Sequence, residues 1–334
     1  EKVIKESEGM IVASFGDVSP NPDVVEVDAC AEVIRQKNIG FVVALGGGSP
    51  MDCAKAAASV ALTPDSIRKY HGTGVAMPEK HLPLIAVPTT AGTGSETTLA
   101  AVITDAETRH KYAINDFPLI PRYAVLDPKV TLSLPPFITA TTGMDALTHA
   151  IEAFVSVGAH PLTDANALEA IRLINLWLPK AVDDGHNLEA REQMAFGQYL
   201  AGMAFNSAGL GLVHALAHQP GATHNLPHGV CNAILLPIIE NFNRPNAVAR
   251  FARVAQAMGV DTRGMSDEAA SMSAIQAIRD LSARVGIPSG FSQLGVTKAD
   301  IEGWLDKALA DPCAPCNPRT ASRDEVRELY LEAL

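Results

Sequence analysis

Residues 41–52 read Phe41-Val42-Val43-Ala44-Leu45-Gly46-Gly47-Gly48-Ser49-Pro50-Met51-Asp52, an apolar run followed by three glycines. The apolar run predicts a buried strand, and the glycines let the backbone approach a ligand closely. Ser49 is a good N-cap, Pro50 suits the first helical position, and Asp52 can close a capping box. We therefore expect a helix from Pro50 to about Leu62, whose N-terminus can bind a pyrophosphate.

The same alternation of strand and helix extends on both sides of this stretch. A helix is expected from Pro22 to Lys37. Short apolar runs predict further strands at Met10–Ala13, Leu84–Val87, Ala101–Thr104 and Ala124–Leu126. Buried strands separated by helices are typical of a mainly parallel sheet with helices on both faces. The fold class predicted for this part of the chain is α/β.

A second small-residue loop strengthens the prediction of a nucleotide site. Pro88-Thr89-Thr90-Ala91-Gly92-Thr93-Gly94-Ser95-Glu96 follows the strand at Leu84–Val87. Two such loops, each at the carboxyl end of a buried strand, are typical of a sheet that binds a dinucleotide. Neither loop is GxGxxG, so each could also be a plain glycine-rich turn.

The strand signals stop at Leu134-Pro135-Pro136, and every later periodic segment is helical. We expect a boundary near residue 133, between an α/β dinucleotide-binding domain (1–133) and an all-helical metal-binding, catalytic domain (134–334). The sequence starts at Glu1-Lys2-Val3, without Met, as though inside an element. We therefore expect an N-terminal element of the first domain to be missing.

Four polar side chains interrupt the apolar helical half: Asp145, His149, His214 and His228. Asp145 and His149 are spaced i,i+4, so a helix places both on one face. One carboxylate with three imidazoles suits Fe(II), Zn(II), Mn(II) or Co(II). The alternative is an ordinary surface or capping pair, but polar groups among Ala, Leu, Gly and Met need a partner.

Composition excludes several classes of function. The formal net charge is −11, and no basic block appears, which argues against nucleic-acid binding. No apolar run reaches the length of a membrane span. Five cysteines spread along the chain indicate no disulfide framework and favour a reducing cytoplasm. The lone CxxC at Cys313–Cys316 cannot complete a zinc site.

Several motifs together resemble the iron-containing (group III) alcohol dehydrogenases, over essentially the whole chain. They are residues 46–55, 88–96 and 143–152, His214-x-x-x-His218, Pro227-His228-Gly229 and Asn317-Pro318-Arg319. The resemblance implies NAD(P)-dependent oxidation of alcohols or reduction of aldehydes, by an α/β cofactor domain and a helical metal domain. Members usually begin with a further segment that contains the first strand and an acidic or small residue that reads the adenosine ribose, so NAD versus NADP stays open.

The resemblance also implies roles for single residues. Asp145, His149, His214 and His228 match the metal ligands, and Fe(II) is favoured while Zn(II) is permitted. His218 matches a histidine beside the nicotinamide and substrate, which could relay a proton or be structural. His224 matches no ligand and is taken as a loop histidine. Cofactor contacts are implied at Gly46, Gly47, Ser49, Thr89, Thr90 and Thr93, with Ser95, Val102 and Lys111 as further candidates.

We therefore predict a cytoplasmic, metal-dependent oxidoreductase that transfers hydride between NAD(P) and a small primary alcohol or diol. Few charged residues flank the site motifs, which favours a neutral substrate over a phosphorylated one. Three alternatives remain: a dehydroquinate-synthase-like lyase, a glycerol dehydrogenase, and a non-catalytic metal-storage protein. The apolar helical half makes a homodimer or larger homo-oligomer plausible.

Overall fold

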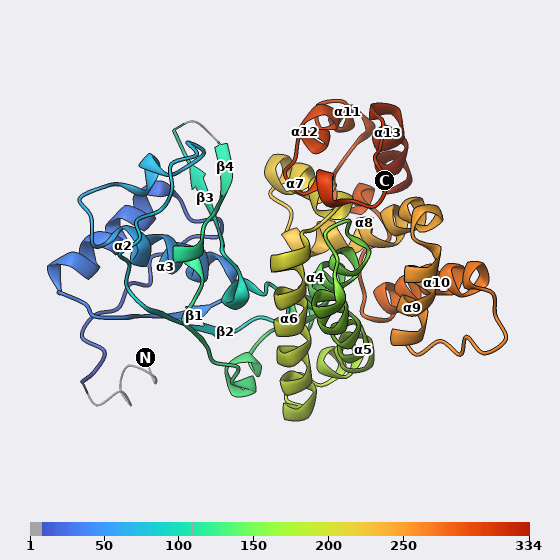
Figure 1. Cartoon of the computed structure of the whole chain (residues 1–334), viewed down its shortest axis with the longest axis horizontal. Helices are drawn as coiled ribbons and strands as arrows, with labels where there is room; N and C mark the ends of the chain where they lie inside the picture. Colours follow the sequence, from blue (N-terminus) through green and yellow to red (C-terminus); the bar gives the residue numbers. More distant parts are fainter. Residues whose placement is uncertain (1–8, 108–109) are drawn as a thin grey trace. The chain divides into compact units, whose positions relative to one another are not determined.

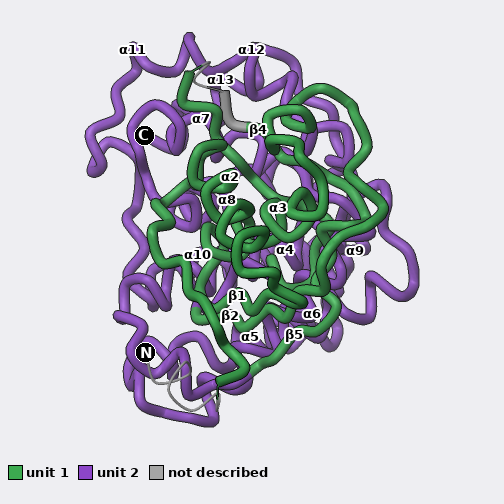
Figure 2. Tube along the Cα trace, turned by 90° about the vertical axis from the view of Figure 1, so that its left-hand side faces the viewer, with its two compact units in different colours: residues 1–89, 95–126 green, residues 90–94, 127–334 purple. Residues whose placement is uncertain are grey.

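The computed structural model describes residues 9–107 and 110–334 (Figure 1). The chain divides into two compact units, shown in separate colours in Figure 2. Unit 1 contains Glu1–Thr89 and Ser95–Leu126, and unit 2 contains Thr90–Gly94 and Asp127–Leu334. Each unit has a buried apolar cluster of its own, which is what an independent core requires.

The main sheet of unit 1 is parallel, as the sequence predicted. Its strands are β1 (Val42–Gly46), β2 (Leu84–Pro88) and β5 (Tyr123–Ala124), in the order β1-β2-β5. Gly46 at the end of β1 pairs with Pro88 at the end of β2. The two small-residue loops therefore leave the same edge of the sheet from adjacent positions.

Three predicted strands differ from the structure. The strand expected at Ala124–Leu126 is β5, which ends at Ala124. Residues 101–104 do lie in a strand, β3 (Ala100–Asp105), but it pairs antiparallel with β4 (His110–Asn115) in a separate two-stranded sheet. Residues Met10–Ala13 form no strand. Met10 and Val12 are 71% and 64% exposed, so this segment buries too little apolar surface to offset the entropy of ordering it.

The helices of unit 1 lie on one face of the main sheet. Helix α2 (Val24–Gln36) begins at a capping box between Asp23 and Glu26, and it packs on α3 (Gly48–Val60). Helix α3 packs in turn on β1. On the opposite face, Val43 and Leu45 of β1 are 37% and 44% exposed. The prediction of helices on both faces is wrong for the described residues, because α2 covers α3 instead of the second face.

Residues 127–334 of unit 2 are all described, and their regular elements are all helices, which agrees with the predicted fold class. Helix α4 packs against α5, α6 and α8, and its residues 143–155 are buried without a break. A run buried on all sides marks α4 as the central helix of the unit. The helices are α4 (Pro136–Val155), α5 (Pro161–Asp183), α6 (Leu188–Ala208), α7 (Leu212–His224), α8 (His228–Asn243), α9 (Val248–Ala257), α10 (Asp267–Arg284), α11 (Lys298–Ile301), α12 (Leu305–Leu309) and α13 (Arg323–Glu332).

Membrane-spanning helices were also sought over the described ranges. No single helix there is both long and apolar enough to cross a membrane. Helices α6 and α7 meet the test of length and composition only as a pair, and the pair is bent by 105°.

Candidate metal and cofactor sites

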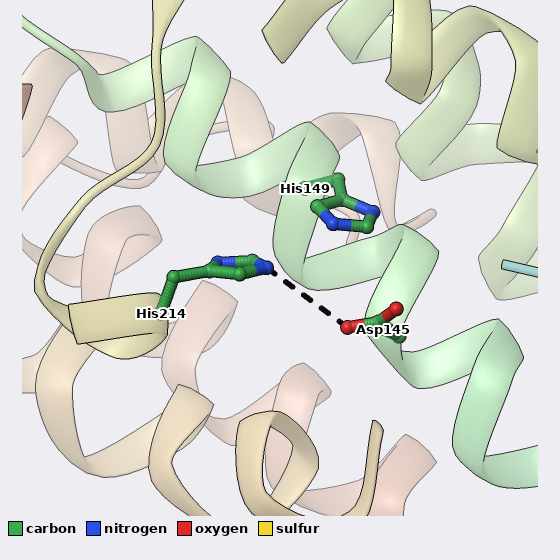
Figure 3. Close-up of side chains that lie close together, drawn as sticks. All are labelled: Asp145, His149 and His214. Carbon is green, nitrogen blue, oxygen red and sulfur yellow. Dashed lines mark ion pairs between the residues drawn. The ribbon is translucent and has the colours of Figure 1, made fainter. Parts of the chain in front are cut away.

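Helix α4 carries the first two candidate metal ligands on one buried face. Asp145 and His149 are 4% and 5% exposed, one turn apart, as their spacing predicted. His214, from the first turn of α7, faces them (Figure 3). One donor atom from each of the three residues lies within 4.8 Å of the other two. The structure thus brings together three residues that the chain separates by up to 69 positions.

His228 joins this cluster from the first turn of α8. Its Nε2 lies 3.7 Å from Asp145 Oδ1, while His214 Nε2 lies 4.0 Å from the same oxygen. The His228 side chain is 42% exposed, whereas those of Asp145 and His214 are 5% or less. Three of the four side chains are therefore buried, and His228 is the one that solvent reaches.

A buried carboxylate fixes the orientation of His214. His214 Nδ1 lies 2.5 Å from Glu152 Oε2, and the other oxygen of Glu152 accepts the Val213 backbone N–H at 2.7 Å. Because Nδ1 donates its proton to Glu152, the lone pair of His214 is on Nε2, the atom that faces Asp145. A carboxylate behind a ligating imidazole is a usual support of metal sites.

The electrostatics of the cluster suit a divalent cation. Burial alone would raise the pKa of Asp145, but the facing imidazoles lower it below its ordinary value, so Asp145 is ionised. Burial and the neighbouring His149 hold the pKa of His214 well below its ordinary range, so this ring is neutral. Ionised carboxylate and neutral imidazole are the ligating forms.

The geometry also fits a metal ion. His149 Nδ1 is buried and has no hydrogen-bond partner among the described residues. Its ring is held between Phe205 and His214, with centroid distances of 4.4 and 4.8 Å. Two ligands at about 2.1 Å from one ion lie roughly 3.3 Å apart, so the observed separations of 3.7 and 4.0 Å need small adjustments of the ligand side chains. The Asn232 side-chain nitrogen, 2.6–3.1 Å from three of these donor atoms, must also turn away for an ion to bind.

The carboxylate behind His214 gives a first prediction. In Glu152→Gln an amide replaces one carboxylate oxygen, and an N–H facing Nδ1 favours the tautomer with the proton on Nε2. We expect metal affinity to fall about 10–100-fold, as for other supports of ligating histidines. Competition with a chelator of known affinity measures it, and Glu169→Gln on the surface of α5 is the control. Wild-type affinity in Glu152→Gln would contradict this role.

A second buried carboxyl lies near Glu152. Glu240 of α8 accepts a hydrogen bond from Asn243 Nδ2 at 3.0 Å, and Asn243 exchanges amide bonds with Asn317. Asn317 Oδ1 also accepts the Leu212 N–H at the start of α7. Burial and the charge of Glu152 raise the pKa of Glu240 to about 8. Glu240 is therefore protonated in the folded protein at neutral pH.

The raised pKa of Glu240 predicts a pH dependence of stability. Its folded pKa of about 8 exceeds the ordinary 4.5, so its contribution to stability is complete below pH 4.5 and is lost as pH rises to about 8. The glutamine of Glu240→Gln cannot ionise. We therefore expect the free energy of unfolding of this variant, relative to that of wild type, to increase by on the order of 2–4 kcal/mol as pH rises over that range. Denaturation of both proteins between pH 5 and 9 measures the difference. A difference that is constant with pH would contradict the assignment.

His218 lies beside the cluster rather than in it. Its ring stacks on His228 with centroids 5.4 Å apart, and its Nδ1 lies 2.8 Å from Asp311 Oδ2. Burial acts to raise the pKa of Asp311, but the hydrogen bond to His218 and the other contacts of Asp311 outweigh burial. The pKa of Asp311 is therefore below its ordinary value. The loop position predicted for His224 is wrong, because α7 extends to this residue, which lies 3.6 Å from Asp300.

The first cofactor loop starts its helix earlier than predicted. Helix α3 begins at Gly48 with Gly47 as N-cap, and no side chain caps it. The capping box expected from Ser49 and Asp52 is wrong, because Asp52 accepts hydrogen bonds from Ser95 Oγ and the Val102 N–H instead. A helix start without a side-chain cap keeps its N–H groups available to an anion.

The second cofactor loop passes from unit 1 into unit 2. Thr89 N–H donates to the Gly46 carbonyl at 3.0 Å, next to the first loop. In unit 2, Ala91 N–H donates to Thr142 Oγ1 on α4, and Thr90 Oγ1 is buried with no partner among the described residues. Thr93 lies in the same segment of unit 2.

The further cofactor candidates are placed differently. Ser95 and Val102 are bonded to Asp52, so each is tied to α3. Lys111 lies in β4, and its side chain is outside the described part of the structure.

The sequence analysis missed four residues that contact the candidate site: Glu152, Phe205, Asn232 and Asp311. Glu152 stood inside the motif at 143–152, as the only carboxylate in an apolar run after His149. Its isolation there was a usable signal. Phe205, Asn232 and Asp311 carried no such signal, because their proximity to the histidines depends on the tertiary fold.

Comparisons with known proteins agree with this arrangement. Residues 1–128 match the model of the iron-containing alcohol dehydrogenases, and residues 139–334 match that of the C-terminal part of the Fe-containing alcohol dehydrogenase family. The NAD-dependent methanol dehydrogenase of Bacillus methanolicus is 43% identical over 333 residues, which cover 100% of this chain and 87% of that protein.

Solved structures agree as well. A 1,3-propanediol oxidoreductase has a TM-score of 0.94 and 42% identity, covering 96% of this chain and 84% of the other. The sulfoacetaldehyde reductase of Bifidobacterium kashiwanohense, solved in complex with NAD+, has a TM-score of 0.91 and 42% identity, covering 99% and 86%. With two matching family models that span most of its length, this chain belongs to the iron-containing alcohol dehydrogenase family.

Proposed function

We propose that this enzyme transfers hydride reversibly between NAD(P) and a small primary alcohol or diol at a metal held by Asp145, His149, His214 and His228. Family membership establishes the class, an NAD-dependent alcohol dehydrogenase. The observation that carries the metal proposal is the convergence of one buried carboxylate and two buried imidazoles with the partly exposed His228, with Glu152 fixing the tautomer of His214. A divalent cation bound there supplies a Lewis acid that lowers the pKa of an alcohol hydroxyl.

The side chains around the metal ligands orient the substrate and hold its proton. Phe205 stacks on His149 and supplies an apolar wall beside the ligands. His218 presents Nε2 while Asp311 holds Nδ1, so it can accept the proton that an alcohol releases on oxidation. Because the His218 side chain is 40% exposed, it can pass that proton to solvent.

The cofactor contacts that we propose follow the two loops. The uncapped start of α3 offers N–H groups to a pyrophosphate, and at Gly46 an added Cβ would lie 2.6 Å from Pro50 Cγ, so no side chain fits there. The proposed contacts are Gly46, Gly47, Ser49, Thr89, Thr90 and Thr93, with Ser95, Val102 and Lys111 as further candidates.

The substrate proposal follows from the relatives and from charge. Two of them are named for methanol and 1,3-propanediol, which are small, neutral and primary alcohols. Around the ligand cluster of this chain the contacts are histidines, Phe205 and paired carboxylates. Among the described contacts of the four ligands there is no Lys or Arg side chain that could pair with a phosphate or sulfonate, so a neutral alcohol or diol fits best.

Metal identity, location and assembly complete the proposal. We propose Fe(II) as the resident metal, since the family is iron-containing, with Zn(II) compatible with the same ligands. We also propose a cytoplasmic homo-oligomer. The five cysteines are free, which suits a reducing compartment.

Metal analysis coupled to an activity panel tests the function. Purified protein is analysed by mass spectrometry for bound metals and assayed with short alcohols and diols against NAD and NADP. We expect a bound divalent metal, loss of activity on chelation, and its recovery with Fe(II) or Zn(II). Full activity after complete chelation would overturn the metal proposal. Sustained NADH formation from a simple alcohol distinguishes a dehydrogenase from a lyase that uses NAD transiently.

A further inference from the structure

The segment 316–319 contacts all three helices that carry the proposed ligands, although it contributes no ligand itself. The carbonyl of Cys316 accepts the Val157 N–H, just beyond the end of α4, at 3.0 Å. Arg319 Nη1 donates to the Phe242 carbonyl near the end of α8 at 2.9 Å. The asparagine between these two residues adds the contact with α7.

The Asn317 side chain joins the first residue of α7 to the last residue of α8. It is buried, and its Oδ1 accepts both the Leu212 N–H and Asn243 Nδ2 at 3.0 Å. Its Nδ2 donates to Asn243 Oδ1 at 2.7 Å and to the Arg319 carbonyl at 2.6 Å. A carboxamide offers two acceptor and two donor positions, and here all four are used. The orientation of Asn317 is therefore fixed.

Helix α7 depends on such distant contacts because it has no cap of its own. Its N-cap is Gly211, which has no side chain to accept the first N–H groups of the helix. The Leu212 N–H donates to Asn317 instead, and the Val213 N–H donates to Glu152 Oε1 at 2.7 Å. An added Cβ at Gly211 would lie 2.8 Å from Asn317 Oδ1 and 2.9 Å from Glu152 Oε1. Glycine at this position thus lets both acceptors reach the helix start.

The turn that these two acceptors hold is the one that carries His214. Glu152 also accepts the Nδ1 proton of His214, so it fixes the ring, while Asn317 fixes the backbone two residues before it. None of the four hydrogen bonds of Asn317 uses a ligand atom, so all of them can persist when a cation binds. A metal site needs its ligands within about 0.5 Å of the productive geometry. A shift of the first turn of α7 therefore weakens the site.

We propose that Asn317 is a positioning residue of the metal centre, which caps the first turn of α7 and thereby holds His214 where the cation requires it. This inference rests on the proposed metal centre. It predicts that losing the oxygen opposite the Leu212 N–H lowers the metal affinity of the folded protein, and not only its stability.

Zinc titrations of two Asn317 variants, in competition with a chelator of known affinity, test the inference. Asn317→Leu has a similar volume and removes the oxygen, so we expect Zn(II) affinity to fall at least about tenfold. Asn317→Asp keeps an oxygen opposite the Leu212 N–H but loses the donors to Asn243 and Arg319. We expect its thermal midpoint to fall in chelator, while its Zn(II) affinity stays within about threefold of wild type.

The visible absorption of bound Co(II) supplies a second readout, because it depends on the geometry of the ligands. We expect an altered Co(II) spectrum in Asn317→Leu and the wild-type spectrum in Asn317→Asp. If Asn317→Leu does not fold, Gly211→Ala tests the same contacts, since its Cβ pushes both acceptors away from the helix start. We expect lower Zn(II) affinity in that variant as well.

The control is another asparagine of the same unit. Asn175 on α5 donates its Nδ2 to the Met258 carbonyl at 2.8 Å, so Asn175→Leu removes one partly buried carboxamide bond. We expect a lower thermal midpoint in Asn175→Leu, with Zn(II) affinity and the Co(II) spectrum unchanged. A loss of stability alone therefore does not reproduce the result expected for Asn317→Leu.

The outcomes separate this inference from the proposed function. A wild-type chain that binds no divalent metal overturns the metal centre itself. Wild-type metal binding, together with an affinity in folded Asn317→Leu within about threefold of it, overturns the role of Asn317 alone. An equal loss of affinity in Asn317→Asp and Asn317→Leu also overturns it, because the capping oxygen would then not be what matters.

Discussion

His214→Ala is expected to lose both bound metal and turnover. The substitution removes a ligand that is 2% exposed and leaves Glu152 without the imidazole that it holds at 2.5 Å. A Lewis acid contributes several kcal/mol to such a reaction, so we expect kcat/KM to fall at least about 1,000-fold. Mass spectrometry of the purified protein measures the metal, and NADH absorbance measures turnover.

Two comparisons separate ligand loss from unfolding. His214→Gln keeps a polar side chain opposite Glu152, so it limits the cost of an unsatisfied buried carboxylate, about 1–3 kcal/mol. His224→Ala, at the other end of α7, removes a histidine that pairs with Asp300 and should leave metal and turnover intact. A folded His214→Gln protein with wild-type metal content would refute His214 as a ligand.

The fold was predictable where local chemistry and burial agree. The strand at 42–46 lies within one residue of its predicted position, and a helix follows the glycine turn as expected, although it begins at Gly48 instead of Pro50. An apolar run and a helical segment are local signals, so both could be predicted. The segment at Met10–Ala13 shows the opposite case. Its apolar run resembles the run at 42–46. A strand also needs a neighbouring strand to pair with, and the local sequence does not show whether one is present.

The sequence likewise predicted some contacts of the candidate site and not others. The i,i+4 spacing of Asp145 and His149 specifies a shared helical face, so their proximity followed from the sequence alone. That α7 and α8 would bring His214 and His228 to that face depends on helix packing, and the sequence supplied it only through the family resemblance. Asp52 was misassigned because a local capping pattern competed with a tertiary bond to Ser95.

Gly92→Ala is expected to impair cofactor use while sparing the metal. A Cβ at Gly92 would lie 1.8 Å from the backbone oxygen of Thr142 and 2.5 Å from its carbonyl carbon. Both atoms belong to the central helix α4, so they cannot move aside as a flexible side chain would. The segment Thr90–Gly94 must shift away by more than an ångström, which also breaks the Ala91 hydrogen bond to Thr142 Oγ1.

The clash in Gly92→Ala is confined to the segment Thr90–Gly94, and this location determines how much cofactor use falls and why the metal is spared. Misplacement of a binding segment by about 1 Å can cost 100-fold, so we expect kcat/KM for NAD to fall by about that factor. Metal content should stay at the wild-type level, because Asp145 and His149 lie further along α4 and keep their contacts. Gly40→Ala is the control, since an added Cβ there meets nothing within 4 Å. A wild-type KM for NAD in Gly92→Ala would show that the loop does not hold the cofactor, whereas loss of metal would show that the strain spreads through α4.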